Sequence, residues 1–223
     1  MVSDSILTFL KDLKITAKLP KGVEVLSPYE NLQTFGLCKQ FYHKYYHDDK
    51  QRTLLLGINP GRFGSGLTGV SFTDPVKLEK YCGIPNDLPK KVELSADFIY
   101  AMIHEYGGIE SFYDKYFISS VCPLGFISGG KNINYYDIPK LEKAITPFII
   151  ESLNKLIDMG MSPEKVFCIG GDKNLKSLTR LNEKHHWFKE IFPLPHPRFI
   201  MQYRRKKMKE YVELWLRTLN IEH

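Results

Sequence analysis

The sequence predicts an α/β fold in which a central, mostly parallel four-stranded sheet is flanked by helices. Four short apolar runs recur with longer helix-like or loop segments between them, which is typical of strands joined by crossovers. The chain has 223 residues, 43% of them hydrophobic, and no linker rich in Pro, Gly and Ser divides it, so residues 1–223 are expected to form a single domain. The strands are expected at 53–58, 116–121, 165–169 and 190–194.

Apolar residues at helical spacing predict the helices that flank this sheet. The first two are expected to form a helical lid on the core, and the last closes the chain. Asp172 follows Gly170-Gly171 and is expected to cap a helix. The expected ranges are 5–13, 35–46, 96–106, 138–159, 173–181 and about 204–219.

Polar or small residues stand at or just beyond the ends of all four predicted strands: Asn59, Ser120, Gly170-Gly171 and His196. In an open α/β sheet, ligands bind outside the carboxyl ends of the strands. We therefore expect these residues, although distant in the sequence, to share one cleft.

Charge and cysteine content narrow the classes of partner. With 31 Lys and Arg against 25 Asp and Glu, the formal net charge is +6, the sign expected for a protein that binds a polyanion. The four cysteines are scattered singly without a Cys-x-x-Cys pair, so we expect reduced thiols, no metal and no iron–sulfur cluster. No leader or membrane-length apolar run is visible, which predicts a cytoplasmic protein (nucleoid-associated in a bacterium, nuclear in a eukaryote) with no membrane partner.

Three stretches together resemble a known enzyme family. Residues 57–72, GINPGRFGSGLTGVSF, resemble the first motif of the single-strand-selective monofunctional uracil-DNA glycosylases, the third family of the uracil-DNA glycosylase superfamily. Residues 119–124, SSVCPL, are similar to that family's Asn-x-Cys-Pro-Leu element, with Ser120 in place of the asparagine. His196-Pro197-Arg198 resembles its His-Pro-x-Pro-Arg element with a shortened start. The resemblance covers roughly residues 26–208, and its departures indicate a sister branch.

The resemblance implies a DNA glycosylase of base excision repair that flips out a deaminated base and hydrolyses its N-glycosidic bond, leaving an abasic site. Uracil is the first expected substrate. His196 would donate a hydrogen bond to the oxyanion that develops on the leaving base, and Asn59 would position the attacking water. Without the resemblance, His196 in a Pro-rich turn and Asn59 at the start of a turn would be ordinary surface residues.

The same resemblance assigns the base pocket. Phe72 would stack on the flipped base, although core packing alone would also explain a Phe there. Gly61 would lie beside the C5 edge, where the absence of a side chain should admit bulkier bases, and Ile58 is assigned to the same pocket. Ser120, shorter than asparagine and able to donate or accept, predicts weaker discrimination for uracil and tolerance of hypoxanthine or xanthine.

A basic segment with apolar residues follows His196 and is assigned to DNA. An apolar wedge can fill the space that an extruded base leaves, and the wedge candidates are Phe199, Ile200 and Met201. Arg62 is expected at a backbone phosphate or, equally, beside a surface carboxylate. Asp74 is expected to cap a helix that begins at Pro75 rather than to lie near the sugar. The remaining phosphate contacts are expected from Arg198, Arg204, Arg205, Lys206 and Lys207. For Lys206 and Lys207, a solvated basic start of the last helix is an equal alternative.

The same motifs bear on the alternative functions. No lysine stands in the three motifs where a Schiff base would form, so the expected enzyme is a monofunctional hydrolase. We also expect it to need no cofactor and to act as a monomer on damaged single- or double-stranded DNA. A nucleotide hydrolase would need Gly-Lys-Ser/Thr in the glycine-rich loop at 57–64, which is absent. A DNA-binding module with an inactive glycosylase-like pocket stays open, since Ser120 would fit a lost activity.

Overall fold

A four-stranded parallel sheet forms the centre of the computed structural model, which describes residues 1–220. Its strands lie in the order β3-β2-β6-β7, and they are β2 (Thr53–Gly57), β3 (Tyr116–Ser120), β6 (Lys165–Ile169) and β7 (Glu190–Leu194). The predicted sheet is thus confirmed, with every strand end within one residue of its expected position. β2, β3 and β6 are almost entirely buried, which is why their sequences are continuous apolar runs.

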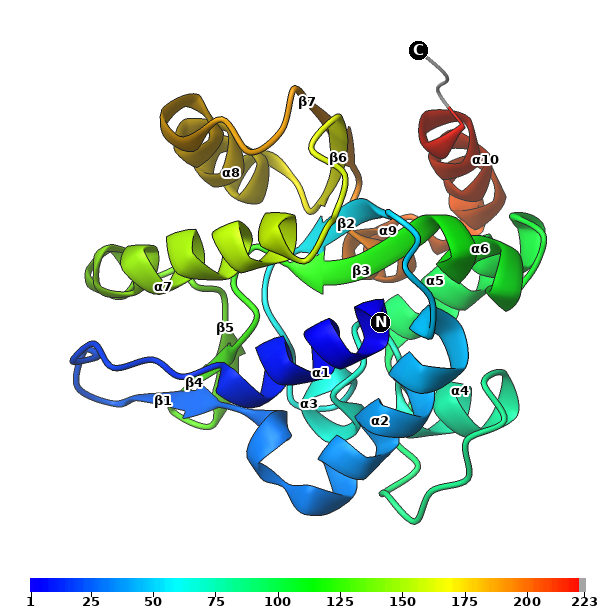
Figure 1. The fold of residues 1–223 in the computed structure, drawn as a ribbon, viewed down its shortest axis with the longest axis horizontal. Coiled ribbons are helices and arrows are strands. Elements are labelled where there is room, and N and C mark those ends of the chain that lie inside the picture. The colour runs from blue at the N-terminus through cyan, green and yellow to red at the C-terminus, as the bar shows by residue number, and fades with distance from the viewer. Residues whose placement is uncertain (221–223) are drawn as a thin grey trace.

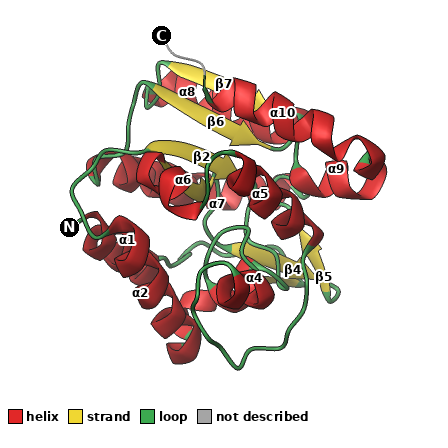
Figure 2. Ribbon diagram, turned by 90° about the vertical axis from the view of Figure 1, so that its right-hand side faces the viewer, coloured by secondary structure: helices red, strands yellow, loops and turns green. Residues whose placement is uncertain are grey.

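Helices cover both faces of this sheet. Figures 1 and 2 show α5 (Leu94–Glu105), α6 (Ile109–Lys115) and α10 (Met208–Leu219) on one side, and α7 (Pro139–Asp158) and α8 (Asp172–His185) on the other. On the first side, the fully buried Trp215 of α10 packs edge-on against Phe98 of α5, with ring centroids 5.3 Å apart. Burial of such large aromatic rings fixes α10 against α5.

The two N-terminal helices, α1 (Val2–Asp12) and α2 (Leu32–Tyr46), contact each other and pack below the sheet as a helical layer (Figure 1). Short helices extend this layer, and they are η1 (Pro28–Glu30), α3 (Ser65–Thr68) and α4 (Pro75–Lys80). Asp74 caps α4 as predicted, because its Oδ1 accepts a 2.8 Å hydrogen bond from the Lys77 N–H.

A second, three-stranded antiparallel sheet was not predicted from the sequence. Its strands are β1 (Val23–Leu26), β4 (Gly125–Ser128) and β5 (Lys131–Ile133), in the order β1-β4-β5. Gly129 and Gly130 form the β4–β5 turn with φ of +54° and +70°, values that suit a tight hairpin. This hairpin places Asn132 beside the loop that follows β2.

Two sequence predictions near helix ends were wrong. The closing helix begins at Met208 rather than near Arg204, and it is preceded by α9 (Pro197–Tyr203) and η2 (Arg205–Lys207). Asp172 is the first residue of α8, and the N-cap is Gly171, which makes no side-chain capping hydrogen bond. Within residues 1–220, none of the helices has the length and apolar character needed to cross a membrane.

Candidate active site

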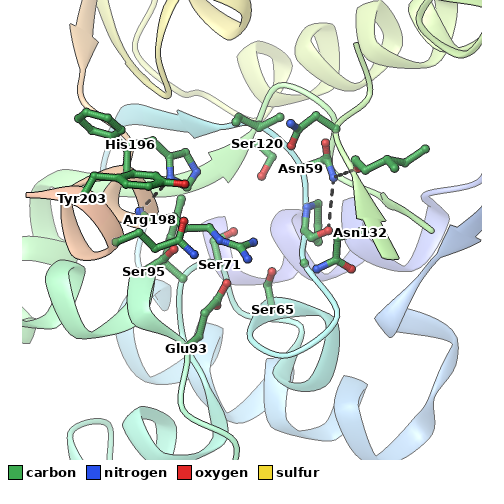
Figure 3. A pocket seen from close by; sticks show the side chains of 18 residues that line it. Asn59, Ser65, Ser71, Glu93, Ser95, Ser120, Asn132, His196, Arg198 and Tyr203 are labelled. Carbon is green, nitrogen blue, oxygen red and sulfur yellow. Dashed lines mark hydrogen bonds between the residues drawn. The ribbon is translucent and has the colours of Figure 1, made fainter. Parts of the chain in front are cut away.

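A cavity of about 350 Å³ opens at the carboxyl ends of β2, β3 and β7. Figure 3 shows His196 and Asn59 on opposite walls, with Ser120 between them. Of the strand-end residues that were expected to share a cleft, Asn59, Ser120 and His196 line this cavity, whereas Gly170 and Gly171 do not. Of the site residues predicted from the sequence, the cavity is lined by Ile58, Asn59, Gly61, Phe72, Ser120, His196, Arg198 and Phe199.

His196 is held as a neutral hydrogen-bond donor. It caps α9, with Nδ1 accepting a 3.0 Å hydrogen bond from the backbone N–H of Arg198, so the ring proton of the neutral form is on Nε2. Burial, and then the nearby Arg198 charge, lower the pKa of His196 to about 4. Gly170 lies against His196 and Ile58, and a Cβ there would come closest to the Ile58 side chain, at 3.1 Å.

Asn59 is fixed by the chain that leaves β5. Its Oδ1 accepts a 3.0 Å hydrogen bond from the backbone N–H of Tyr135, and its Nδ2 donates to the carbonyl of Ile133 over 3.2 Å. These two contacts set which way the amide faces. Because a carbonyl oxygen has two lone pairs, Oδ1 keeps one acceptor position for a water molecule.

Phe72 forms an aromatic wall with an unusual backbone. Its φ is +50°, a value that is sparsely populated for residues other than glycine and that often occurs at functional sites. Its ring centroid lies 5.9 Å from that of His196, and Gly57 lies against the ring, where a Cβ would be 3.1 Å away and would press on it. A flat ring is therefore held next to the imidazole, as a stacking surface requires.

Two further positions shape the pocket. Ser120 ends β3 opposite Gly57 of β2; it is 8% exposed, and its hydroxyl faces the cavity (Figure 3). Gly61 lies beside the Asn132 side chain, whose Nδ2 would be 3.3 Å from a Cβ at that position. The missing side chain at Gly61 thus leaves space in the pocket, and Asn132 forms the adjacent part of the wall.

Sequence reasoning missed several polar residues of this cavity. Glu93 is the most unusual, since burial, and then the charge of Asp74, raise its pKa to about 7 against the lowering effect of Arg198. Asn132 could have been found from the Gly129-Gly130 hairpin signal, whereas no motif marks Glu93. The missed polar residues are Ser65, Ser71, Glu93, Ser95, Asn132, Asn134, Gln202 and Tyr203.

The expected DNA-contacting residues divide into exposed and buried groups. Phe199 is 44% exposed at the cavity, but Ile200 is 0% and Met201 5% exposed, because they form the inner face of α9. The wedge prediction is therefore wrong for Ile200 and Met201. The exposed cations of this segment are Arg198, Arg204, Arg205, Lys206 and Lys207.

In the described residues Arg62 pairs with no surface carboxylate, and its expected contact to a backbone phosphate stays a prediction. Its guanidinium donates to the carbonyl of Gly130 and lies 4.6 Å from the centre of the Phe63 ring. Arg204 likewise lies over Phe199, at 5.6 Å.

The geometry above agrees with the comparisons to known proteins. The family model described as the uracil DNA glycosylase superfamily matches residues 43–220. The chain belongs to the uracil-DNA glycosylase superfamily. The crystal structure of wild-type Pedobacter heparinus SMUG2 is similar over 98% of this chain and 96% of that one, with 45% identity and a TM-score of 0.94. The predicted resemblance to the third family of the superfamily is thus confirmed, and superfamily membership supports a glycosylase-type function with DNA as the partner.

Proposed function

We propose that this protein is a monofunctional DNA glycosylase that extrudes a deaminated base, uracil first, and hydrolyses its N-glycosidic bond to leave an abasic site. One observation carries the proposal: Asn59 and His196 come from the ends of different strands and line the same cavity. A donor for the leaving base and an acceptor for the attacking water are the two functions that this hydrolysis needs.

His196 serves the leaving group. Cleavage places positive charge on the sugar and negative charge on the departing base. The Nε2–H of the neutral imidazole donates to the developing O2 oxyanion of uracil, which stabilises the transition state by about 3 kcal/mol if it equals one oxyanion-hole donor. Since the pKa of His196 is about 4, the imidazole is neutral at physiological pH when the base binds, and it acts as a neutral hydrogen-bond donor.

Asn59 serves the nucleophile. An amide has no useful basicity, so it orients the water while the cation-like sugar supplies the reactivity. The contacts to Tyr135 and Ile133 keep the carbonyl oxygen in a fixed direction before DNA arrives. No lysine is among the residues that line the cavity within the described chain, which supports hydrolysis without a Schiff base and strand cleavage.

The pocket supports a broader range of bases than uracil alone. Phe72 stacks on the extruded base with Ile58 beside it, Gly61 leaves space at the C5 edge, and Ser120 contacts the Watson–Crick edge with a rotatable hydroxyl. A hydroxyl that donates or accepts fits hypoxanthine and xanthine as well as uracil. Phe199 is the remaining wedge candidate, and the exposed cations of α9 and η2 contact phosphates.

The test is abasic-site formation on uracil-containing oligonucleotides, with binding measured in parallel. We expect His196→Ala and Asn59→Ala each to lose about 10²-fold or more in single-turnover rate with only modest loss of binding. The control is His104→Ala, which replaces a histidine exposed on α5 outside the cavity and should match the wild type. Binding by the wild type without product would favour the alternative, a DNA-binding module with an inactive pocket.

A further inference from the structure

A second cavity, of about 430 Å³, lies directly beside the base pocket. The two share one wall, so a ligand that extends from the first cavity across this wall reaches the second. Residues common to both are Glu93, Ser95, Asn132, Arg198 and Gln202.

The second cavity presents an aromatic ring of the kind on which bases stack. Phe63 is 41% exposed and lines the cavity together with the apolar side chains of Val92 and Leu94. Its ring is held by two cations, Arg62 at 4.6 Å and Lys91 at 4.8 Å from the ring centre. An exposed apolar ring costs free energy in water, and sequence-tolerant stacking of a nucleobase removes that ring from solvent.

The charge of this cavity suits a phosphodiester. Arg62, Lys131 and Arg198 line it against a single carboxyl group, Glu93. The Arg62 guanidinium is anchored by a hydrogen bond to the carbonyl of Gly130. Since the pKa of Glu93 is raised to about 7, this carboxyl is only partly charged at neutral pH and opposes a phosphate less than an ordinary glutamate would.

We propose that the second cavity binds the nucleotide adjacent to the extruded one, with its base on the Phe63 ring and its phosphate against Arg62 and Arg198. The inference rests on the proposed function, because it takes a DNA strand with a base in the first cavity. Stacking of a base is stronger than an exposed cation–π contact, so the base displaces Lys91 into solvent, where the ammonium is well hydrated.

The test is binding to single-stranded oligonucleotides that carry a stable tetrahydrofuran abasic analogue at the target position. Three versions are compared by fluorescence anisotropy: both neighbouring bases present, the 5′ neighbour's base removed, and the 3′ neighbour's base removed. For the wild type, removal of the base on one side should raise Kd about tenfold, as loss of one stacked base would. Phe63→Ala should bind the intact oligonucleotide about tenfold more weakly and lose nothing further when that base is removed.

Two variants control for loss of surface apolar area. Phe63→Tyr keeps the ring and should retain the wild-type dependence on the neighbouring base. Tyr81→Ala removes an aromatic side chain of similar exposure, 44%, outside both cavities, and should bind every oligonucleotide as the wild type does.

The proposal is overturned if removal of either neighbour's base leaves the wild-type Kd unchanged, or if Phe63→Ala keeps the full dependence. Because this test measures binding and not base excision, it distinguishes failure of the second-cavity site from failure of the glycosylase proposal. Abasic-site formation with no role for Phe63 removes the subsite alone. The predicted binding pattern without any abasic product removes the glycosylase proposal alone.

Discussion

Two titratable side chains of the cavity have pKa values that are shifted from their ordinary values. His196 stays neutral down to a pH near 4, so its donor function is constant across the neutral range. Glu93 has a pKa of about 7 because it is buried near the carboxylate of Asp74. A perturbed carboxyl in a cleft is a functional candidate by itself, and here it is located at the wall between the two cavities.

Glu93→Gln should stabilise the protein at high pH. The folded-state pKa of about 7 lies above the ordinary 4.5, so the native state holds a proton that the unfolded state has lost between these pH values. The unfolding free energy of the wild type therefore decreases as pH rises from 4.5 to 7. We expect the variant to exceed the wild type by about 1–2 kcal/mol at pH 8 and to equal it near pH 4.5, as measured by urea denaturation. A constant difference between the two proteins at all pH values would contradict this assignment.

Ser120→Asn should narrow the range of bases that are excised. An asparagine amide offers both a donor and an acceptor to uracil and occupies the space that a larger base needs. Single-turnover rates on uracil, hypoxanthine and xanthine should show the uracil preference rising about tenfold or more. Unchanged selectivity would mean that Ser120 does not contact the base edge.

At the scale of elements, the sequence predicted the buried strands of the central sheet and missed the short, partly exposed strands and α9. The central strands were predictable because strands buried on both faces are apolar throughout. β1, β4 and β5 have only three or four residues each and are partly exposed, so they carry no such pattern. Ile200 and Met201 were mistaken for a wedge because α9 was not recognised, and on a helix they turn inward.

Gly125→Ala should impair catalysis through the loop that carries Asn59. A Cβ at Gly125, the first residue of β4, would lie 2.4 Å from the carbonyl oxygen of Pro60, too close for any real contact. Pro60 must move, and Asn59 moves with it. We expect the single-turnover rate to fall about tenfold or more, because small misplacements of catalytic groups are costly, while Kd for DNA changes little.

The matched control is Gly36→Ala on α2, where an added Cβ meets nothing within 4 Å. This variant should keep the full rate. Equal rates for the Gly125 and Gly36 variants would show that the β4 contact does not position Asn59.

At the scale of the whole molecule, the sheet brings the three motifs together, and the net positive charge favours a polyanionic partner. The net charge of +6 includes an exposed cluster just beyond His196, formed by Arg198, Arg204, Arg205 and Lys206. Composition alone predicted a polyanion partner, but only the fold shows that Arg198 lines the cavity and that the other three cations follow directly after Tyr203, another lining residue.

Salt dependence tests that placement. Each phosphate contact to single-stranded DNA contributes roughly 0.7 to the slope of log Kd against log salt concentration. We expect the double substitution Arg205→Ser and Lys206→Ser to reduce the slope by about 1 to 1.5. Lys176→Ser with Lys184→Ser removes the same charge from the exposed side of α8 and should leave the slope unchanged. A similar reduction for both pairs would indicate a general charge effect rather than phosphate contacts at η2.

The central claim is that His196 stabilises the leaving base while Asn59 positions the water. It is tested most directly by single-turnover excision of uracil and of 5-fluorouracil, whose fluorine makes the base a better leaving anion. His196→Ala should slow uracil excision about 10²-fold but 5-fluorouracil excision much less, since the better leaving group needs less stabilisation, whereas Asn59→Ala should slow both equally. Equal losses for the two bases in His196→Ala would contradict the account.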